Sequence, residues 1–334
     1  MNKSPRKSKP LWRQSLLVLV ILAAIFTAVY KSMDNITVHN FITASDGLTA
    51  AFAYLVIGSW VGAISGGVFA LLFGKKLVDP DFEKIQVGSR QMQILALITG
   101  AISAGSTLFL LWGNQFGDPS VMISLGNAVI LYTLLFEVVK RRIDAKSVWF
   151  PAVLVMLGGM MAAFGGSLQI TLIGFFFVLV VSNGLTAFSE IVEQKGTQIS
   201  DGVNFFLWRF FWLAVTGTTL AFSVSAIRGH LPLLVSTILV GIHYIPWITL
   251  TMFFVFLGVG LKLVAKKKNA VSLVLVVLSL QIVLGFPITI LGSWLVPGLF
   301  GVVPTSLTVW LVRLLGAGLI ILGVYILRRK KVLE

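Results

Sequence analysis

One arginine, Arg209, lies in the stretch FFLWRFFWLA, residues 205–214. The nine remaining residues of this stretch are all apolar. A guanidinium group stays charged in proteins and is costly to place away from water. Two interpretations follow. The side chain reaches the lipid–water interface along its apolar stem, or it pairs with an acid or with a substrate. Glu190 ends the preceding apolar stretch and falls at a similar depth in an antiparallel hairpin, so it is the predicted partner of Arg209.

Four further side chains join Arg209 as candidate substrate contacts. Asn127 and Asn183 fall within apolar stretches, where an amide either bonds to a neighbouring helix or lines a cavity. Arg313 lies inside the last apolar stretch, with snorkelling to the interface as its alternative. Trp208, next to Arg209, is predicted either to line the cavity or to face lipid and neighbouring helices.

Three acids have simpler explanations. Glu137 and Glu193 stand beside basic residues at predicted helix ends, so we expect water to solvate them. Asp118 precedes Pro119, a pattern typical of a helix N-cap followed by proline at the first helical position. Neither role predicts a catalytic carboxylate.

Glycines recur every fourth residue at Gly58, Gly62 and Gly66. Small residues at this spacing let two helices approach closely within a membrane. We expect the stripe to pack against another helix of the same chain, with dimerisation as the alternative.

These residues sit in a chain with a membrane-protein composition. Of its 334 residues 57% are hydrophobic and only 11% are charged, whereas soluble domains carry about 25% charged residues. Several apolar stretches approach the ~20 residues that a helix needs to cross a bilayer. The predicted spans are residues 11–31, 49–73, 91–113, 119–139, 148–168, 170–192, 203–226, 247–265, 270–293 and 306–327.

The basic residues orient these spans. With ten spans, all of the 26 Lys and Arg residues except Lys31, Arg209, Arg228 and Arg313 fall on one side. This asymmetry predicts that both termini are cytoplasmic and that the net charge of +14 does not mark a nucleic-acid surface. Residues 231–246 are apolar but too many for the span that follows, so we expect an external amphipathic or re-entrant segment ending near Pro246.

The residues of common enzymes are missing from the predicted spans. The chain has no cysteine, and its three histidines fall in predicted external segments, so no buried Ser–His pair forms. No phosphate-binding GxxxxGK[ST] motif is present. We therefore predict no enzyme activity, no metal site and no cofactor.

Ten spans divide into two halves of five, and an odd number inverts the second half relative to the first. The expected division is a basic tail at residues 1–14, repeats at 15–168 and 169–328, and a tail at 329–334. Inverted repeats are a recurrent architecture of secondary transporters, with the binding site at their interface. The fold class predicted is therefore an all-α polytopic membrane protein of ten helices in two inverted repeats.

Two segments resemble a known family. NFFLWRFFWLA, residues 204–214, and SLGNAVILYTLLFEVVKRR, residues 124–142, are similar to the EamA-like branch of the drug/metabolite transporter superfamily. The first half has no arginine that matches Arg209, and Ser293 stands where a glutamate matching Glu137 would fall.

The resemblance implies a ten-helix transporter of small organic metabolites in a bacterial-type plasma membrane, with efflux more usual than uptake. Multidrug efflux is the alternative within transport, and a non-transporting membrane scaffold is the alternative of another class. The first apolar stretch, Leu16–Tyr30, holds no acid, which argues against proton-coupled export of cations. The expected partners are a neutral or anionic small molecule and the bilayer, and a homodimer is compatible with the sequence.

Overall fold

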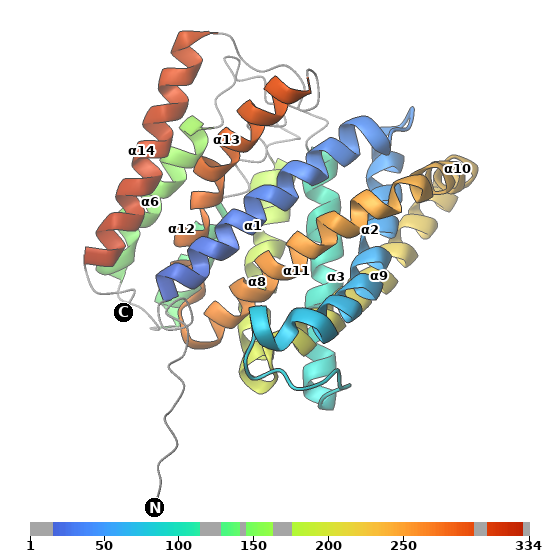
Figure 1. Cartoon of the computed structure of the whole chain (residues 1–334), viewed down its shortest axis with the longest axis horizontal. Helices are drawn as coiled ribbons and strands as arrows, with labels where there is room; N and C mark the ends of the chain where they lie inside the picture. The colour runs from blue at the N-terminus through green and yellow to red at the C-terminus, as the bar shows by residue number, and fades with distance from the viewer. Residues whose placement is uncertain (1–15, 114–127, 141–144, 163–175, 297–305, 330–334) are drawn as a thin grey trace, which may run out of the picture.

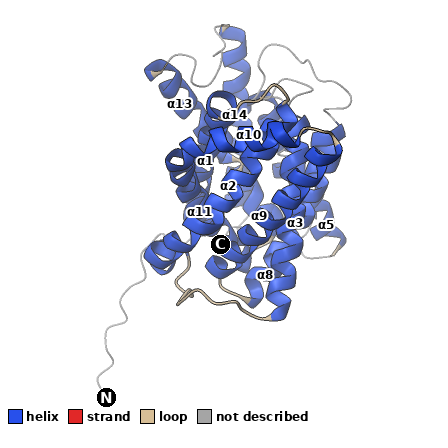
Figure 2. Ribbon diagram, turned by 90° about the vertical axis from the view of Figure 1, so that its right-hand side faces the viewer, coloured by secondary structure: helices blue, strands red, loops and turns tan. Residues whose placement is uncertain are grey.

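A computed structural model of the chain describes residues 16–113, 128–140, 145–162, 176–296 and 306–329, and every element in these ranges is helical (Figures 1 and 2). The elements are α1 (Leu16–Ile36), the π-helix η2 (Thr37–Phe41), α2 (Gly47–Phe69), the π-helix η3 (Ala70–Val78), α3 (Arg90–Gly113), α5 (Val129–Val139), α6 (Ala145–Ala162), the π-helix η6 (Phe176–Ser182), α8 (Asn183–Ile199), α9 (Gly202–Ile227), α10 (Leu231–Gly241), the 3₁₀ turn η7 (Ile242–Tyr244), α11 (Ile245–Lys268), α12 (Val271–Leu278), α13 (Leu280–Leu295) and α14 (Leu307–Arg329).

Seven of the described helical segments are long and apolar enough to cross a membrane, so the chain is an all-α membrane protein with several spans. Three shorter apolar helices, Val129–Val139, Val148–Ala162 and Val271–Gly285, lie at the predicted fourth, fifth and ninth spans. α2 and η3 together run from Gly47 to Val78. These 32 residues would extend about 48 Å at 1.5 Å per residue, beyond a hydrocarbon core of about 30 Å.

The segment predicted to be external forms a helix of its own. α9 ends at Ile227, and Gly229 turns the chain with a φ of 71°, a left-handed conformation that glycine adopts without strain. Figure 1 shows α10 almost end-on beside α2, while α11 runs across the view. α10 has no polar face, because Val235 and Leu239 are exposed and Leu234 is buried. The amphipathic alternative is therefore wrong, and the re-entrant alternative stays a prediction. The next helix begins beside Pro246, as expected.

The same tripeptide begins α2 and α9. Asp46 in Ser-Asp-Gly accepts a hydrogen bond from Thr49 N at 3.2 Å, and Asp201 in a second Ser-Asp-Gly accepts one from Asn204 N at 2.8 Å. Each aspartate thereby satisfies an amide that the first helical turn leaves unpaired.

Glycines set the closest helix contacts. Gly158 of α6 and Gly316 of α14 face each other so closely that a Cβ on Gly158 would lie 2.6 Å from the Gly316 carbonyl oxygen. A Cβ on Gly323 would lie 2.9 Å from the carbonyl oxygen of Pro151 in α6. The α6–α14 pair lies at one edge of the molecule, at the left of Figure 1.

The predicted glycine stripe of α2 faces two helices. A Cβ on Gly62 would lie 2.8 Å from the Phe210 ring of α9, and one on Gly66 would lie 3.3 Å from Leu207. A Cβ on Gly58 would be 3.7 Å from Met252 of α11. The α2–α9 crossing has a second close point, where a Cβ on Gly217 would lie 3.2 Å from Leu55.

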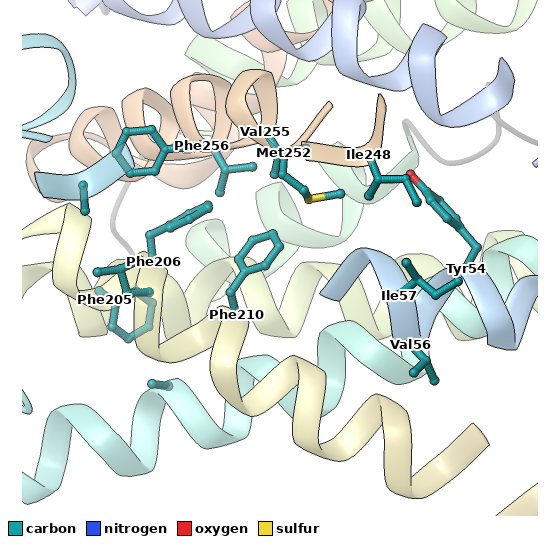
Figure 3. Packing of buried hydrophobic residues seen from close by; sticks show 14 of the residues in the cluster. Tyr54, Val56, Ile57, Phe205, Phe206, Phe210, Ile248, Met252, Val255 and Phe256 are labelled. Carbon is teal, nitrogen blue, oxygen red and sulfur yellow. The ribbon is translucent and has the colours of Figure 1, made fainter. Parts of the chain in front are cut away.

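The larger apolar core joins α2, α3, α9 and α11. Figure 3 shows Phe206 and Phe210 of α9 directed toward Met252 and Phe256 of α11. The Phe206 and Phe256 rings meet edge to face at 5.4 Å between centroids, the arrangement that aromatic quadrupoles favour. This core holds the face of α9 adjoining Arg209 against α11.

Candidate functional site

Arg209 is an interior residue, paired with an acid other than the predicted one. Its side chain is 12% exposed, and its Nε lies 3.0 Å from Oε1 of Glu193, which is 1% exposed. Nη2 donates a hydrogen bond to Ser103 Oγ of α3 at 3.0 Å. The predicted pair with Glu190 is wrong because α8 continues to Ile199, past the predicted helix end at residue 192. The longer hairpin places Glu193 opposite Arg209.

Two lysines of α11 complete the cluster. Lys262 and Lys266 are four residues apart and therefore share one helix face. Lys262 Nζ donates to Glu190 Oε1 at 2.9 Å, and Lys266 Nζ donates to Glu193 Oε2 at 2.6 Å. Lys266 also forms an ion pair with Glu190, and its side chain is fully buried. We call Glu190, Glu193, Arg209, Lys262 and Lys266 the ionic cluster.

The ionic cluster corrects the expectation that Glu193 is solvated. Cations surround Glu193 in place of water, because none of the five side chains is more than 12% exposed. Removing one charge from such a site strands its partner away from water. The cluster contains one more cation than carboxylates. Its ion pairs join α8, α9 and α11, so they break if these helices move apart.

A seam of hydroxyl groups extends from the ionic cluster between α3 and α8. Ser103 Oγ, which accepts from Arg209, lies 3.1 Å from Ser189 Oγ. Further along, Ser106 Oγ lies 2.5 Å from Thr186 Oγ1, and Ser182 Oγ donates to the Ser106 carbonyl oxygen at 3.0 Å. Hydrogen bonds of this kind join helices where water is absent. The seam fixes α8, and hence both glutamates, against α3.

A second acid lies within a helix where the sequence analysis expected none. The predicted first span ended at residue 31, but α1 continues to Ile36 and includes Asp34. The hydroxyl group of Tyr54 in α2 hydrogen-bonds to Asp34 Oδ1. Close by, Trp247 Nε1 of α11 donates to Thr37 Oγ1 at 3.0 Å. Because α1 includes Asp34, the first helix no longer speaks against proton-coupled export of cations.

Asp46 ties the start of α2 to the turn that follows α9. Arg228 Nη1 donates to Asp46 Oδ2 at 2.9 Å, and His230 Nδ1 lies 3.3 Å from the same oxygen. Partial burial raises the pKa of Asp46, but hydrogen bonds from Thr49, Arg228 and His230 outweigh it and hold the pKa below its ordinary value. This end of α9 is therefore fixed to the start of α2.

Glu137 is also buried, contrary to the expectation that water solvates it. Its carboxylate accepts hydrogen bonds from the backbone of Val271 at 2.6 Å and of Ser272 at 3.0 Å, and from the Ser272 hydroxyl group. These amides belong to the first turn of α12, which needs external acceptors. Glu137 therefore caps a helix distant in sequence, a role that the sequence of its own helix does not indicate.

The remaining predicted site residues have other surroundings. Trp208 Nε1 donates to the Gln86 carbonyl oxygen at 2.8 Å, which ties it to the segment between η3 and α3. Arg313 Cζ lies 5.7 Å from the centroid of Trp310, one turn away on α14. Asn183 is buried at the start of α8. Asn127 and Asp118 lie outside the described residues.

Sequence reasoning missed Lys262 and Lys266 because it counted them as loop charges. The signal was present in GVGLKLVAK, residues 258–266, where two lysines four residues apart interrupt an apolar stretch. A helix that extended to residue 268 would have placed both on one inner face. The boundary of a single helix thus decided whether they were topology signals or site residues.

Comparison with known proteins shows a shared fold. No protein-family model matches the chain, and no curated protein matches it. A solved structure titled "Crystal structure of protein" aligns with a TM-score of 0.58 and 11% identity, over 93% of this chain and 95% of that chain. At this identity the likeness shows a shared fold over nearly the whole length of both chains.

Proposed function

We propose that this chain is a secondary transporter of the drug/metabolite type, which moves small organic molecules across a bacterial-type plasma membrane, in the direction of efflux. Its ten spans form two inverted repeats of five, with both termini cytoplasmic. The single observation that carries the proposal is the order in which the helices pack. A charged interior supports it further.

The most extensive helix contacts form pairs that exchange when the proposed halves are exchanged. The first half comprises α1, α2, α3, α5 and α6, and the second comprises α8, α9, α11, α12 with α13, and α14. α1 packs on α11, and its counterpart α8 packs on α3. α3 packs on α9, and α11 packs on α2. α1 packs on α13, and α8 packs on α5, while α2–α9 and α6–α14 are pairs of counterparts. Such a pattern is expected of inverted repeats that meet at an interface.

Atomic contacts at the α2–α9 crossing support the same register. With the capping residues Asp46 and Asp201 aligned, Gly62 matches Gly217 and Leu55 matches Phe210. Gly62 faces Phe210, and Gly217 faces Leu55. The two contacts therefore exchange when the halves are exchanged, as a twofold axis between α2 and α9 requires.

The ionic cluster favours a transporter over a scaffold. Ionisable residues within membrane-spanning bundles are expensive, and they mark substrate and ion pathways. The cluster and the hydroxyl seam place polar groups from α3, α8, α9 and α11 in the interior. The excess of one cation favours neutral or anionic substrates over cationic ones.

Transport by purified protein in liposomes tests the proposal. The liposomes are loaded with one solute at a time from a panel of amino acids, sugars, organic acids and cationic dyes, and exchange with external labelled solute is followed. We expect saturable exchange of a neutral or anionic metabolite. Exchange of the dyes alone would favour multidrug efflux. No exchange across the panel, with folded protein in the membrane, would favour a scaffold.

A further inference from the structure

Two polar pairs occupy equivalent positions in the two proposed repeats. Tyr54 follows the capping residue Asp46 by the same spacing as Arg209 follows the capping residue Asp201. Each contacts an acid near the end of the preceding helix, Asp34 for Tyr54 and Glu193 for Arg209. The first half thus has no second arginine because a tyrosine stands at that position.

The two pairs lie toward opposite ends of the bundle. Asp46 is bonded to Arg228, which follows the last residue of α9, whereas Asp201 precedes the first residue of α9. The 26 residues of α9 span about 39 Å between these ends. We call Asp34–Tyr54 the outer pair and Glu193–Arg209 the inner pair, from the proposed orientation of the chain.

We propose that the outer and inner pairs are the two gates of an alternating-access cycle, and that the resting protein opens more readily at the outer gate. The inference rests on the proposed transport function and assigns residues to its conformational steps. Each pair joins the first two helices of one repeat at the end where they meet. Separating those helices opens one end of the repeat interface while the other pair keeps its end closed.

The chemistry of the two pairs is unequal. The outer pair joins a neutral phenol to a carboxylate. The inner pair is embedded in the ionic cluster, where Lys262 and Lys266 bring the third helix of the second repeat to the same acids. Opening the inner gate must separate buried charges of opposite sign, whereas opening the outer gate leaves a phenol that water readily solvates. The outer gate therefore opens at lower cost.

Labelling of a single cysteine tests the gates, because the chain has no cysteine of its own. The reporter is Thr27→Cys on α1, which is 3% exposed and packs against Gly258 of α11. Thr27 lies about two turns from Asp34 toward the inner end, and Gly258 lies about one turn from Lys262 toward the outer end. The reporter therefore sits between the gates. A small, charged, membrane-impermeant thiol reagent is applied to right-side-out or inside-out vesicles.

Two substitutions open one gate each. Tyr54→Phe removes the outer hydroxyl group, and Lys266→Met removes a cation shared by both glutamates. Tyr244→Phe and Lys267→Met are matched controls at residues outside the two gates. We expect Tyr54→Phe to speed labelling from the outside about tenfold, since a hydrogen bond to a charged group is worth about that factor. Lys266→Met should speed labelling from the inside, and the controls should change neither rate.

Equal acceleration from both sides, or no acceleration by either gate variant, would overturn the gates. Should Tyr54→Phe or Lys266→Met fail to elute as a folded species, Asp34→Asn or Glu193→Gln takes its place with the same expected side. Labelling needs no substrate, so the two proposals fail separately. Solute exchange in liposomes with labelling indifferent to all gate variants refutes the gates alone. Side-specific labelling without exchange of any solute refutes transport, but it still assigns the closure of each end of the bundle to its pair.

Discussion

The pairing of Arg209 with Glu193, rather than with Glu190, is open to a quantitative test. Both partners are nearly enclosed, with 12% and 1% of their side chains exposed. Removing one partner of a buried pair costs ~3–5 kcal/mol, against 0–1 kcal/mol at the surface. We therefore expect Arg209→Ala and Glu193→Ala each to lower the free energy of unfolding by ~3–5 kcal/mol.

The double variant carries the decisive number. Once Arg209 is absent, Glu193 has already lost its ion-pair partner on α9, so removing Glu193 as well costs less. The double variant should therefore lose about 2–3 kcal/mol less unfolding free energy than the two single variants lose together. Arg209→Ala combined with Glu190→Ala should show a smaller coupling, because both glutamates pair with the lysines of α11 but the ion pair of Arg209 is with Glu193.

The measurement is unfolding by titration of a denaturing detergent into mixed micelles, followed by fluorescence of the nine tryptophans. Arg209→Ala combined with Asp81→Ala is the control, since Asp81 forms an exposed pair with Lys267 and its effect should add within about 0.5 kcal/mol. Strict additivity of Arg209→Ala and Glu193→Ala would refute the pairing. So would a larger coupling of Arg209 with Glu190.

Four other expectations are simpler. Gly62→Leu should lower the thermal unfolding temperature in detergent, because the leucine side chain would overpack against Phe210 at a cost of about 1–3 kcal/mol. An unchanged unfolding temperature would place the glycine stripe against lipid. Glu137→Ala should destabilise by about 1–3 kcal/mol, since buried amides lose their acceptor, and a neutral result in the same assay would contradict the capping role. Folding lowers the pKa of Asp46, so its carboxylate stabilises the fold above the unfolded pKa of about 4, and this stability is lost as the pH falls. In an acid titration, wild type should be more stable than Asp46→Asn at neutral pH, and this difference in stability should disappear in acid. In intact cells Val296→Cys should react with an impermeant maleimide and Lys267→Cys only after permeabilisation, and labelling of Lys267→Cys in intact cells would reverse the orientation.

The sequence predicted the helices well because apolar length is a local property. Each of the ten predicted spans overlaps a described helix, and the apolar stretch before Pro246 was separated from the span after it. Helix ends were less predictable. α1 and α8 both continue past the predicted span ends at residues 31 and 192, and the added residues include Asp34 and Glu193.

The site depended on contacts that local sequence does not encode. Glu137 and Glu193 stand beside basic residues in the sequence, so solvation was the simplest expectation, yet both are enclosed by partners from other helices. Only the position of α11 shows that Lys266 lies between two glutamates. The repeated Ser-Asp-Gly at Asp46 and Asp201 was readable from sequence. The structure shows that both aspartates are N-caps, and that the helices they begin, α2 and α9, pack on each other.

Solute exchange in liposomes tests the central claim most directly. Wild-type protein, Arg209→Ala and Lys267→Met are reconstituted in equal amounts, and exchange of neutral and anionic metabolites is measured across the panel. The account predicts saturable exchange by the wild type, its loss in Arg209→Ala within the ionic cluster, and its retention in Lys267→Met at the exposed neighbouring pair. Absence of exchange by folded wild-type protein for every solute would contradict it.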